Sequence, residues 1–181
     1  MELFFIAPSL RKLDLAATEV LACCISEPER PPRGVAGLVD FRLAGRISRF
    51  LQRGDMTGRL GEVTLVPGKP KLPFDKLLFF GIGDPSALDE RRYRAVVKRM
   101  LETLSGLRTR TAVVELPGRH DGRIEADRAA DLLLEQAAEL PELDSWTLVE
   151  TPESARLVSQ RMIQERRRVR RGEGARVPRE P

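Results

Sequence analysis

A short glycine-containing turn is the first segment of this sequence whose residue types could do chemistry. Gly81 and Gly83 form a G-x-G motif at the end of an apolar run, and Asp84 follows directly. Between a strand and a helix, such a turn can present backbone N–H groups to a phosphate. The motif lacks a third glycine, and Asp84 puts negative charge where a phosphate would lie. A structural turn is therefore favoured, and a ligand loop made by Gly81, Gly83 and Asp84 is the alternative.

Two stripes of like charge recur at helical spacing and could meet a partner. The basic stripe comprises Arg42, Arg46, Arg49 and Arg53. The acidic stripe comprises Asp127, Asp131, Glu135 and Glu139. Residues at this spacing share one helix face, so the favoured interpretation is two solvated faces. Complementary patches for self-association or for a protein partner are the alternative.

The C-terminal segment carries the densest positive charge of the sequence. Its cluster comprises Arg166, Arg167, Arg168, Arg170 and Arg171. Residues 161–181 hold eight arginines against three glutamates, so the net charge of +4 belongs to this segment. Such a cluster attracts nucleic acid or another polyanion through counterion release. It lacks the interleaved aromatic residues of single-strand binders, so a solvated helix end and a protein contact stay open as alternatives.

The residues that usually perform catalysis are few and have no recognisable setting. Cys23 and Cys24 are neighbours in an apolar run, so they face opposite sides of a strand and are expected to be buried and inert. The one histidine, His120, lies in a loop with no nucleophile in a recognisable setting beside it, which indicates a surface loop. We therefore expect no catalytic residue, no metal ligand and no cofactor.

The elements that must position these residues follow from hydrophobic periodicity. Strands are predicted over 2–6, 19–25, 62–66, 76–82, 111–116 and 145–150. Helices are predicted over 35–53, 86–105, 124–138 and 152–170. Alternating strands and helices indicate a layered α/β domain with helices on both faces of a mixed sheet. The pair 62–66 and 76–82 has no helix between its strands, so it is predicted to be antiparallel.

The length of 181 residues fits one domain. No apolar run approaches the ~20 residues of a membrane helix, and the first residues lack the basic start and long apolar stretch of a secretory signal. We therefore expect a cytoplasmic protein without membrane contact.

Several segments, in this order, resemble one protein family. They are Val39-Asp40, the run from Ile47 to Glu62, the run from Leu77 to Gly83, and Leu88-Asp89-Glu90-Arg91-Arg92-Tyr93. Together they resemble the N-terminal domain of the leucyl aminopeptidases, the M17 peptidases, over residues 3–165. The resemblance implies a macro-like three-layer α/β/α sandwich with a mixed central sheet of about five or six strands.

The same resemblance implies a division of the chain and a limit on its chemistry. It predicts a macro-like domain over 1–151, a basic helix over 152–171 that corresponds to a truncated connector, and a disordered tail over 172–181. Family enzymes carry a two-metal site in a second domain, and the sequence holds no segment with its signature. No catalytic or metal residue is carried over, and peptidase activity is not expected.

These observations predict a non-catalytic binding, scaffold or regulatory protein that acts through protein contacts and its basic tail. The resemblance adds that the family's N-terminal domain contributes to hexamer architecture and that some members bind DNA. Two alternatives remain. One is nucleic-acid binding through the arginine-rich tail, and the other is binding of an ADP-ribose-type ligand by the macro-like fold.

Overall fold

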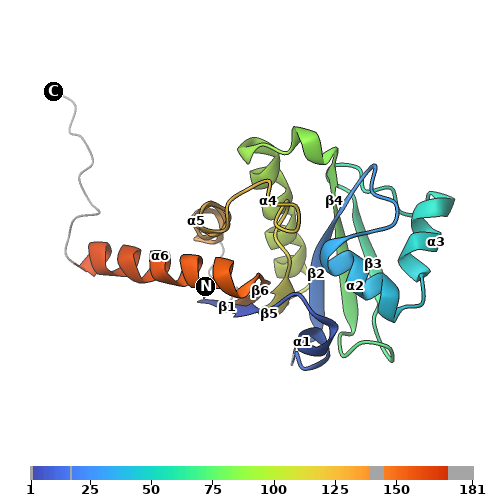
Figure 1. Cartoon of the computed structure of the whole chain (residues 1–181), viewed down its shortest axis with the longest axis horizontal. Helices are drawn as coiled ribbons and strands as arrows, with labels where there is room; N and C mark the ends of the chain where they lie inside the picture. Colours follow the sequence, from blue (N-terminus) through green and yellow to red (C-terminus); the bar gives the residue numbers. More distant parts are fainter. Residues whose placement is uncertain (1, 17, 139–144, 171–181) are drawn as a thin grey trace.

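The protein folds around one six-stranded mixed sheet (Figure 1). The computed structural model describes residues 2–16, 18–138 and 145–170, and side chains up to residue 164. The strands are β1 (Glu2–Ile6), β2 (Val20–Ser26), β3 (Val63–Pro67), β4 (Lys76–Gly83), β5 (Thr111–Val114) and β6 (Ser145–Val149). Their order is β1-β6-β5-β2-β4-β3, and neighbours are parallel except for the predicted antiparallel pair β3 and β4.

Helices cover both faces of the sheet, which explains why its inner strands are apolar throughout. On one face lie α1 (Leu10–Asp14), α2 (Gly34–Arg42) and α3 (Arg46–Arg53). On the other lie α4 (Glu90–Gly106) and α5 (Ala126–Ala137). Strands buried on both faces read as continuous hydrophobic runs. The expected three-layer, macro-like sandwich with a mixed sheet is confirmed.

The adjacent cysteines show how the two faces divide. Cys23 packs with the core of α1–α3, and Cys24 packs with the core of α4 and α5. Both are fully buried, and burial raises the pKa of each thiol well above its ordinary value. The prediction of two buried, inert thiols on opposite sides of one strand agrees with this packing.

The last helix, α6 (Pro152–Arg170), packs on α5 and extends away from the sheet (Figure 1). The Val158 side chain of α6 is buried against Ala126 and Ala130 of α5. Thr151 caps its start, because its hydroxyl accepts a hydrogen bond from the Ser154 N–H at 3.2 Å.

The helix predicted over 35–53 was wrong in one respect, because the chain forms two helices there. Ala44 and Gly45 adopt positive φ angles of 53° and 76°, which ends α2 and turns the chain. The Asp40 carboxylate then caps α3 by accepting hydrogen bonds from the N–H groups of Ile47 at 2.7 Å and Ser48 at 3.0 Å. A buried carboxylate therefore makes a corner where periodicity alone indicated a continuous helix.

Some element boundaries also differ from the prediction, and one short helix was missed. Helix α4 begins at Glu90, after an Asp89 cap, because Pro85–Ala87 form a separate 3₁₀ turn, η1. Strand β5 ends at Val114 rather than at residue 116. The five-residue helix α1 had not been predicted. The tail predicted to be disordered, 172–181, lies outside the described residues, and the division into domains stays a prediction.

Candidate ligand-binding cleft

A cleft of about 790 Å³ opens at the carboxyl ends of the parallel strands. Its walls are the loops that follow β1, β2, β4, β5 and β6, together with the N-terminus of α2. Open α/β sheets bind ligands at this edge, because the loops there converge on exposed helix starts. The volume lies within the range of ~300–1,000 Å³ typical of small-molecule sites.

Glu115 forms the floor of the cleft, one residue after β5. Its side-chain Oε1 accepts a hydrogen bond from the Val35 N–H at 3.0 Å, at the start of α2. The residue is 3% exposed, and its Oε2 has no hydrogen-bond partner among the described residues. Burial raises the pKa of the Glu115 carboxyl from 4.5 to about 8, against the opposing effect of the backbone N–H groups of Val35 and Cys24. Glu115 is therefore mostly uncharged at neutral pH.

Glu29 and His120 form a second polar group beside Glu115. Glu29 Oε2 accepts a hydrogen bond from the Ser26 hydroxyl at 2.8 Å. Glu29 Oε1 lies 3.7 Å from His120 Nε2 and has no hydrogen-bond partner within the described part of the chain. Two carboxyl groups at the cleft therefore each have one buried oxygen without a hydrogen-bond partner among the described residues.

A buried ion pair fixes the back of the cleft. Arg119 donates from Nε to Glu150 Oε1 at 2.6 Å and from Nη2 to Glu150 Oε2 at 2.9 Å. The same guanidinium also bonds the Ile124 carbonyl and the Ser154 hydroxyl. Burial lowers the pKa of Arg119, but the hydrogen bonds and charge of Glu150 outweigh it and raise that pKa above its ordinary value. This bidentate pair is structural, since every arm of the guanidinium is committed.

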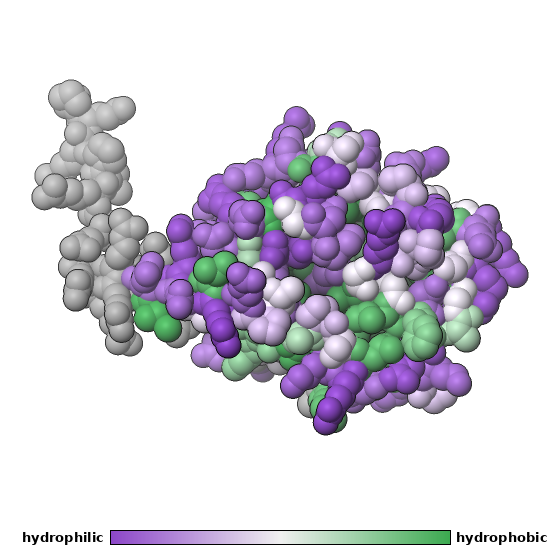
Figure 2. Space-filling view, viewed as in Figure 1, coloured by the Kyte–Doolittle hydropathy of each residue, from purple (hydrophilic) through white to green (hydrophobic). Residues whose placement is uncertain are grey.

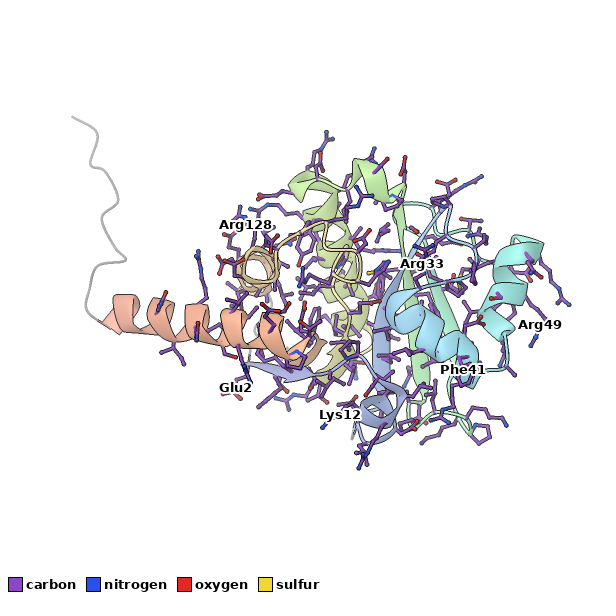
Figure 3. All side chains as sticks on the ribbon, in the orientation of Figure 1. Glu2, Lys12, Arg33, Phe41, Arg49 and Arg128 are labelled. Atoms are coloured by element: carbon purple, nitrogen blue, oxygen red, sulfur yellow. The ribbon has the colours of Figure 1, made fainter. Side chains whose placement is uncertain are left out.

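Three arginines line the rim, where they are open to solvent. Arg30 is held by hydrogen bonds to the backbone carbonyls of Glu27 and Glu29. Arg123 lies 3.4 Å from Asp121. Arg33 comes directly before α2 (Figure 3), and its guanidinium has no hydrogen bond or ion pair to the residues that the structure describes. A planar, always charged guanidinium binds phosphate or carboxylate oxygens well.

The predicted ligand loop lies elsewhere. A Cβ at Gly81 would come within 1.9 Å of the Arg59 carbonyl oxygen, so the glycine allows the segment after α3 to cross β4. Asp84 accepts hydrogen bonds from Ser86 and caps η1. Among the described residues that line the cleft, Pro85 is the one contributed by this turn, and Gly81, Gly83 and Asp84 are not. The favoured structural interpretation of the turn matches this placement.

The basic stripe is divided by the corner between α2 and α3. Arg42 pairs with Asp14 of α1, whereas the Arg46 guanidinium lies 5.4 Å from the centre of the Phe50 ring. Arg49 lies on the outer side of α3 (Figure 3), and Arg53 ends that helix. The four arginines therefore do not share a single helix face, and a role in partner binding stays a prediction.

An apolar patch lies beside this corner on a face that is otherwise largely hydrophilic (Figure 2). It lies over α2, where the Phe41 side chain is 77% exposed. Aromatic residues are enriched at protein–protein interfaces relative to the rest of the surface.

The acidic stripe is largely paired within the fold. Asp131 lies 2.8 Å and Asp127 3.9 Å from Arg161 of α6, and Glu135 lies 2.8 Å from Arg94 of α4. Residue 139 lies outside the described part of the chain. The stripe joins α5 to its two neighbouring helices, which accounts for its spacing without a partner.

The arginine cluster of the tail is beyond structural description. The backbone of α6 is helical as far as Arg170, but the side chains from 165 onward and all of Arg171 lie outside the described residues. Polyanion binding by Arg166, Arg167, Arg168, Arg170 and Arg171 therefore stays a prediction.

Comparison with known proteins decides the family. The sequence model of the cytosol aminopeptidase family, N-terminal domain, matches residues 26–142. The chain belongs to this family. A probable cytosol aminopeptidase of Idiomarina loihiensis is 35% identical over 101 residues, which are 55% of this chain and 20% of that protein. The chain thus spans about a fifth of the length of that relative, and the family model that it matches is that of the N-terminal domain.

Solved structures extend the likeness of this aminopeptidase-family domain to macrodomains. A macrodomain mutant of Oceanobacillus iheyensis has a TM-score of 0.70 at 13% identity, covering 92% of this chain and 93% of that one. A Trypanosoma brucei macrodomain in complex with ADP has a TM-score of 0.67 at 14% identity, covering 88% and 67%. At these identities the likeness shows the fold, and it confirms the expected macro-like architecture.

The described part of this domain meets the requirements of neither a metal cluster nor a membrane-spanning helix. Within it, no cluster of three or more His, Cys, Asp and Glu side chains could hold a metal ion. Among the described helices, none is both long and apolar enough to cross a bilayer.

Sequence reasoning missed the residues that shape the cleft. His120 lies in an exposed loop, as predicted, but its side chain is only 16% exposed and lines the cleft, which the sequence did not indicate. Glu115 was treated as part of a strand. A usable signal was present, because a lone carboxylate that ends a buried parallel strand must find a hydrogen-bonding environment.

Proposed function

We propose that this aminopeptidase-family domain binds a small phosphate-bearing ligand of the nucleoside diphosphate class in the cleft. The observation that carries the proposal is the combination of an open cleft, unpaired carboxyl oxygens at its floor and arginines at its rim. An anionic group would contact Arg30, Arg33 and Arg123, and the rest of the ligand would fill the interior.

The structural relatives support this ligand class. The Trypanosoma brucei macrodomain of the same fold is described as a complex with ADP. The cleft of this chain lies at the carboxyl ends of the parallel strands of its sheet, which is where α/β proteins generally bind their ligands. The proposal uses the cleft and its rim rather than the turn formed by Gly81, Gly83 and Asp84.

The function proposed is binding, with no bond made or broken. Two observations support this choice: the family match covers the N-terminal domain of the aminopeptidases, and the described residues of the cleft include no cluster suited to a metal ion. Scaffold or regulatory contacts through the basic stripe and the tail are a separate part of the proposal, tested by charge reversal of Arg46 and Arg49 and by the oligomeric state.

Isothermal titration calorimetry with ADP and ADP-ribose tests the proposal. We expect saturable binding to the wild type and a loss of about tenfold or more in affinity for Arg33→Glu, since like charge replaces a phosphate contact. Arg99→Glu is the matched control, because Arg99 is an exposed arginine on α4 and does not line the cleft. Absence of binding to the folded wild type at millimolar ligand, or equal affinities for the two variants, would contradict the proposal.

A further inference from the structure

We propose that Glu115 fills the anion-binding position at the N-terminus of α2 from within the protein, and thereby keeps phosphate groups out of the floor of the cleft. The ligand's phosphates are then directed to the rim, and an uncharged hydrogen-bonding group, such as a sugar hydroxyl, contacts the floor. The first part rests on the geometry alone, whereas the second rests on the proposed function.

The start of α2 has the features of an anion site. The helix has nine residues, and the Arg33 side chain at its N-cap makes no capping hydrogen bond. The first N–H groups of a helix lack partners within the helix and attract anionic oxygens. Here the Val35 N–H instead donates to Glu115 Oε1 at 3.0 Å, from a residue 80 positions away in the chain. Glu115 therefore takes the place that a phosphate oxygen would take.

Gly34 makes this contact possible. A Cβ on Gly34 would come within 2.4 Å of Glu115 Oε1 and 2.9 Å of the His120 Cβ, and its φ is +56°. Because position 34 has no side chain, the Glu115 carboxyl reaches the start of α2 and occupies the position beside the Val35 N–H. Three parts of the chain thus meet at this position: the first turn of α2, the residue that follows β5, and the loop that carries His120.

The remaining charges at the floor also disfavour a phosphate. The carboxylates of Glu29 and Glu150 both act electrostatically on Glu115. Arg119 is committed to Glu150, and His120 lies 3.7 Å from Glu29. Arg119 is therefore not available to a phosphate, whereas the Arg33 guanidinium at the rim has no ion pair to a described residue. A doubly charged group gains more at the rim than at the floor.

The free oxygen of Glu115 defines what the floor can accept. Oε2 is buried and has no hydrogen-bond partner among the described residues. Oε1 is fixed by Val35, so the carboxyl plane is held and Oε2 is oriented before a ligand arrives. A hydroxyl group can both donate and accept, and it satisfies Oε2 without introducing a charge. Glu115 is thus a specificity-determining residue: it binds the uncharged, hydroxyl-bearing end of the ligand and leaves the phosphate end at the rim.

Sulfate titration of the ¹⁵N-labelled chain, followed by NMR, tests the assignment of Glu115. Sulfate is the probe because it has the charge of a phosphate group and no sugar. In the wild type we expect the amide signals near Arg30 and Arg33 to shift while the Val35 amide stays unchanged. In Glu115→Ala we expect the Val35 amide to shift with an affinity for sulfate about tenfold higher than that of the wild type.

Glu115→Gln is the matched control, since its amide oxygen still accepts the Val35 hydrogen bond and the position stays filled. It should behave as the wild type does. A Val35 shift in the wild type, or a folded Glu115→Ala that gains no sulfate binding at Val35, would overturn the proposal. Should Glu115→Ala fail to fold, as judged by circular dichroism, Glu115→Thr serves in its place, because its hydroxyl is too short to reach Val35.

The outcome is independent of the calorimetric test with ADP. Gain of sulfate binding in Glu115→Ala without ADP binding to the wild type would retain the role of Glu115 and reject the nucleotide. ADP binding without that gain would retain the cleft as a nucleotide site and reject the role of Glu115.

Discussion

Replacing Glu115 by glutamine should change how the stability of the fold depends on pH. The carboxyl is fully buried, and burial raises its pKa from 4.5 to about 8. Between these values Glu115 is protonated in the folded chain and ionised in the unfolded chain. Unfolding then releases a proton, so the free energy of unfolding falls as pH rises, by about 1.4 kcal/mol per pH unit. The stabilisation that Glu115 gives the folded state through its raised pKa is fully present below pH 4.5 and is lost as pH rises through about 8.

Glutamine is nearly isosteric, keeps the acceptor for the Val35 N–H and does not titrate. The difference in free energy of unfolding between Glu115→Gln and the wild type should therefore grow with pH. Between about pH 5 and pH 7.5 we expect the growth to reach about 3 kcal/mol in favour of the variant. Other titrating groups contribute equally to both chains and cancel in this difference.

Urea denaturation followed by Trp146 fluorescence measures this effect at several pH values. The pH dependence of the wild type alone does not isolate Glu115, since other titrating groups also contribute to it. The difference in free energy of unfolding between the wild type and Glu115→Gln isolates the contribution of Glu115. Parallel stability curves for the wild type and Glu115→Gln would show that Glu115 titrates alike in both states, and would refute the account of a buried, uncharged carboxyl at the floor.

Three further substitutions test the packing that positions the cleft, each by the free energy of unfolding. Gly81→Ala should destabilise the fold by about 1–3 kcal/mol, since its Cβ would lie 1.9 Å from a backbone oxygen. Gly106→Ala is its control, because a Cβ there meets nothing within 4 Å, and it should leave the stability unchanged or slightly raised. Tyr93→Phe removes a buried hydrogen bond of 2.8 Å to a carbonyl of α5 and should cost about 1–2 kcal/mol. Arg119→Ala leaves a buried carboxylate unpaired and should cost about 3 kcal/mol or more. If one of these three variants is as stable as the wild type, the contact that it removes or disturbs does not stabilise the fold as argued.

Most of the fold could be predicted from the sequence because it depends on local patterns. Apolar runs such as β4 reveal buried strands, and Thr151-Pro152 mark the start of α6 through a cap that local chemistry determines. The antiparallel pairing of β3 with β4 followed from the absence of a helix between them. Periodicity failed at the α2–α3 corner, where the Asp40 carboxylate replaces the helical hydrogen bonds that would otherwise have continued.

The cleft could not be predicted in the same way, because its parts come from distant segments. Val35 and Glu115 are 80 residues apart, and their contact depends on the close approach that Gly34 permits. The sequence left a phosphate loop at Gly81 open as an alternative to a structural turn, and the lack of a side chain there allows another segment to cross β4. A glycine in a sequence does not show whether a ligand or another part of the chain needs the space.

The most direct test of the cleft as the ligand site is a titration of the ¹⁵N-labelled chain with ADP, followed by amide chemical shifts. The account predicts saturable shifts concentrated in the loops after β2 and β5, including Arg33 and His120, with little change on the outer faces of α3 and α4. Shifts concentrated on α6 or scattered over the surface, or no shifts at millimolar ADP, would contradict it.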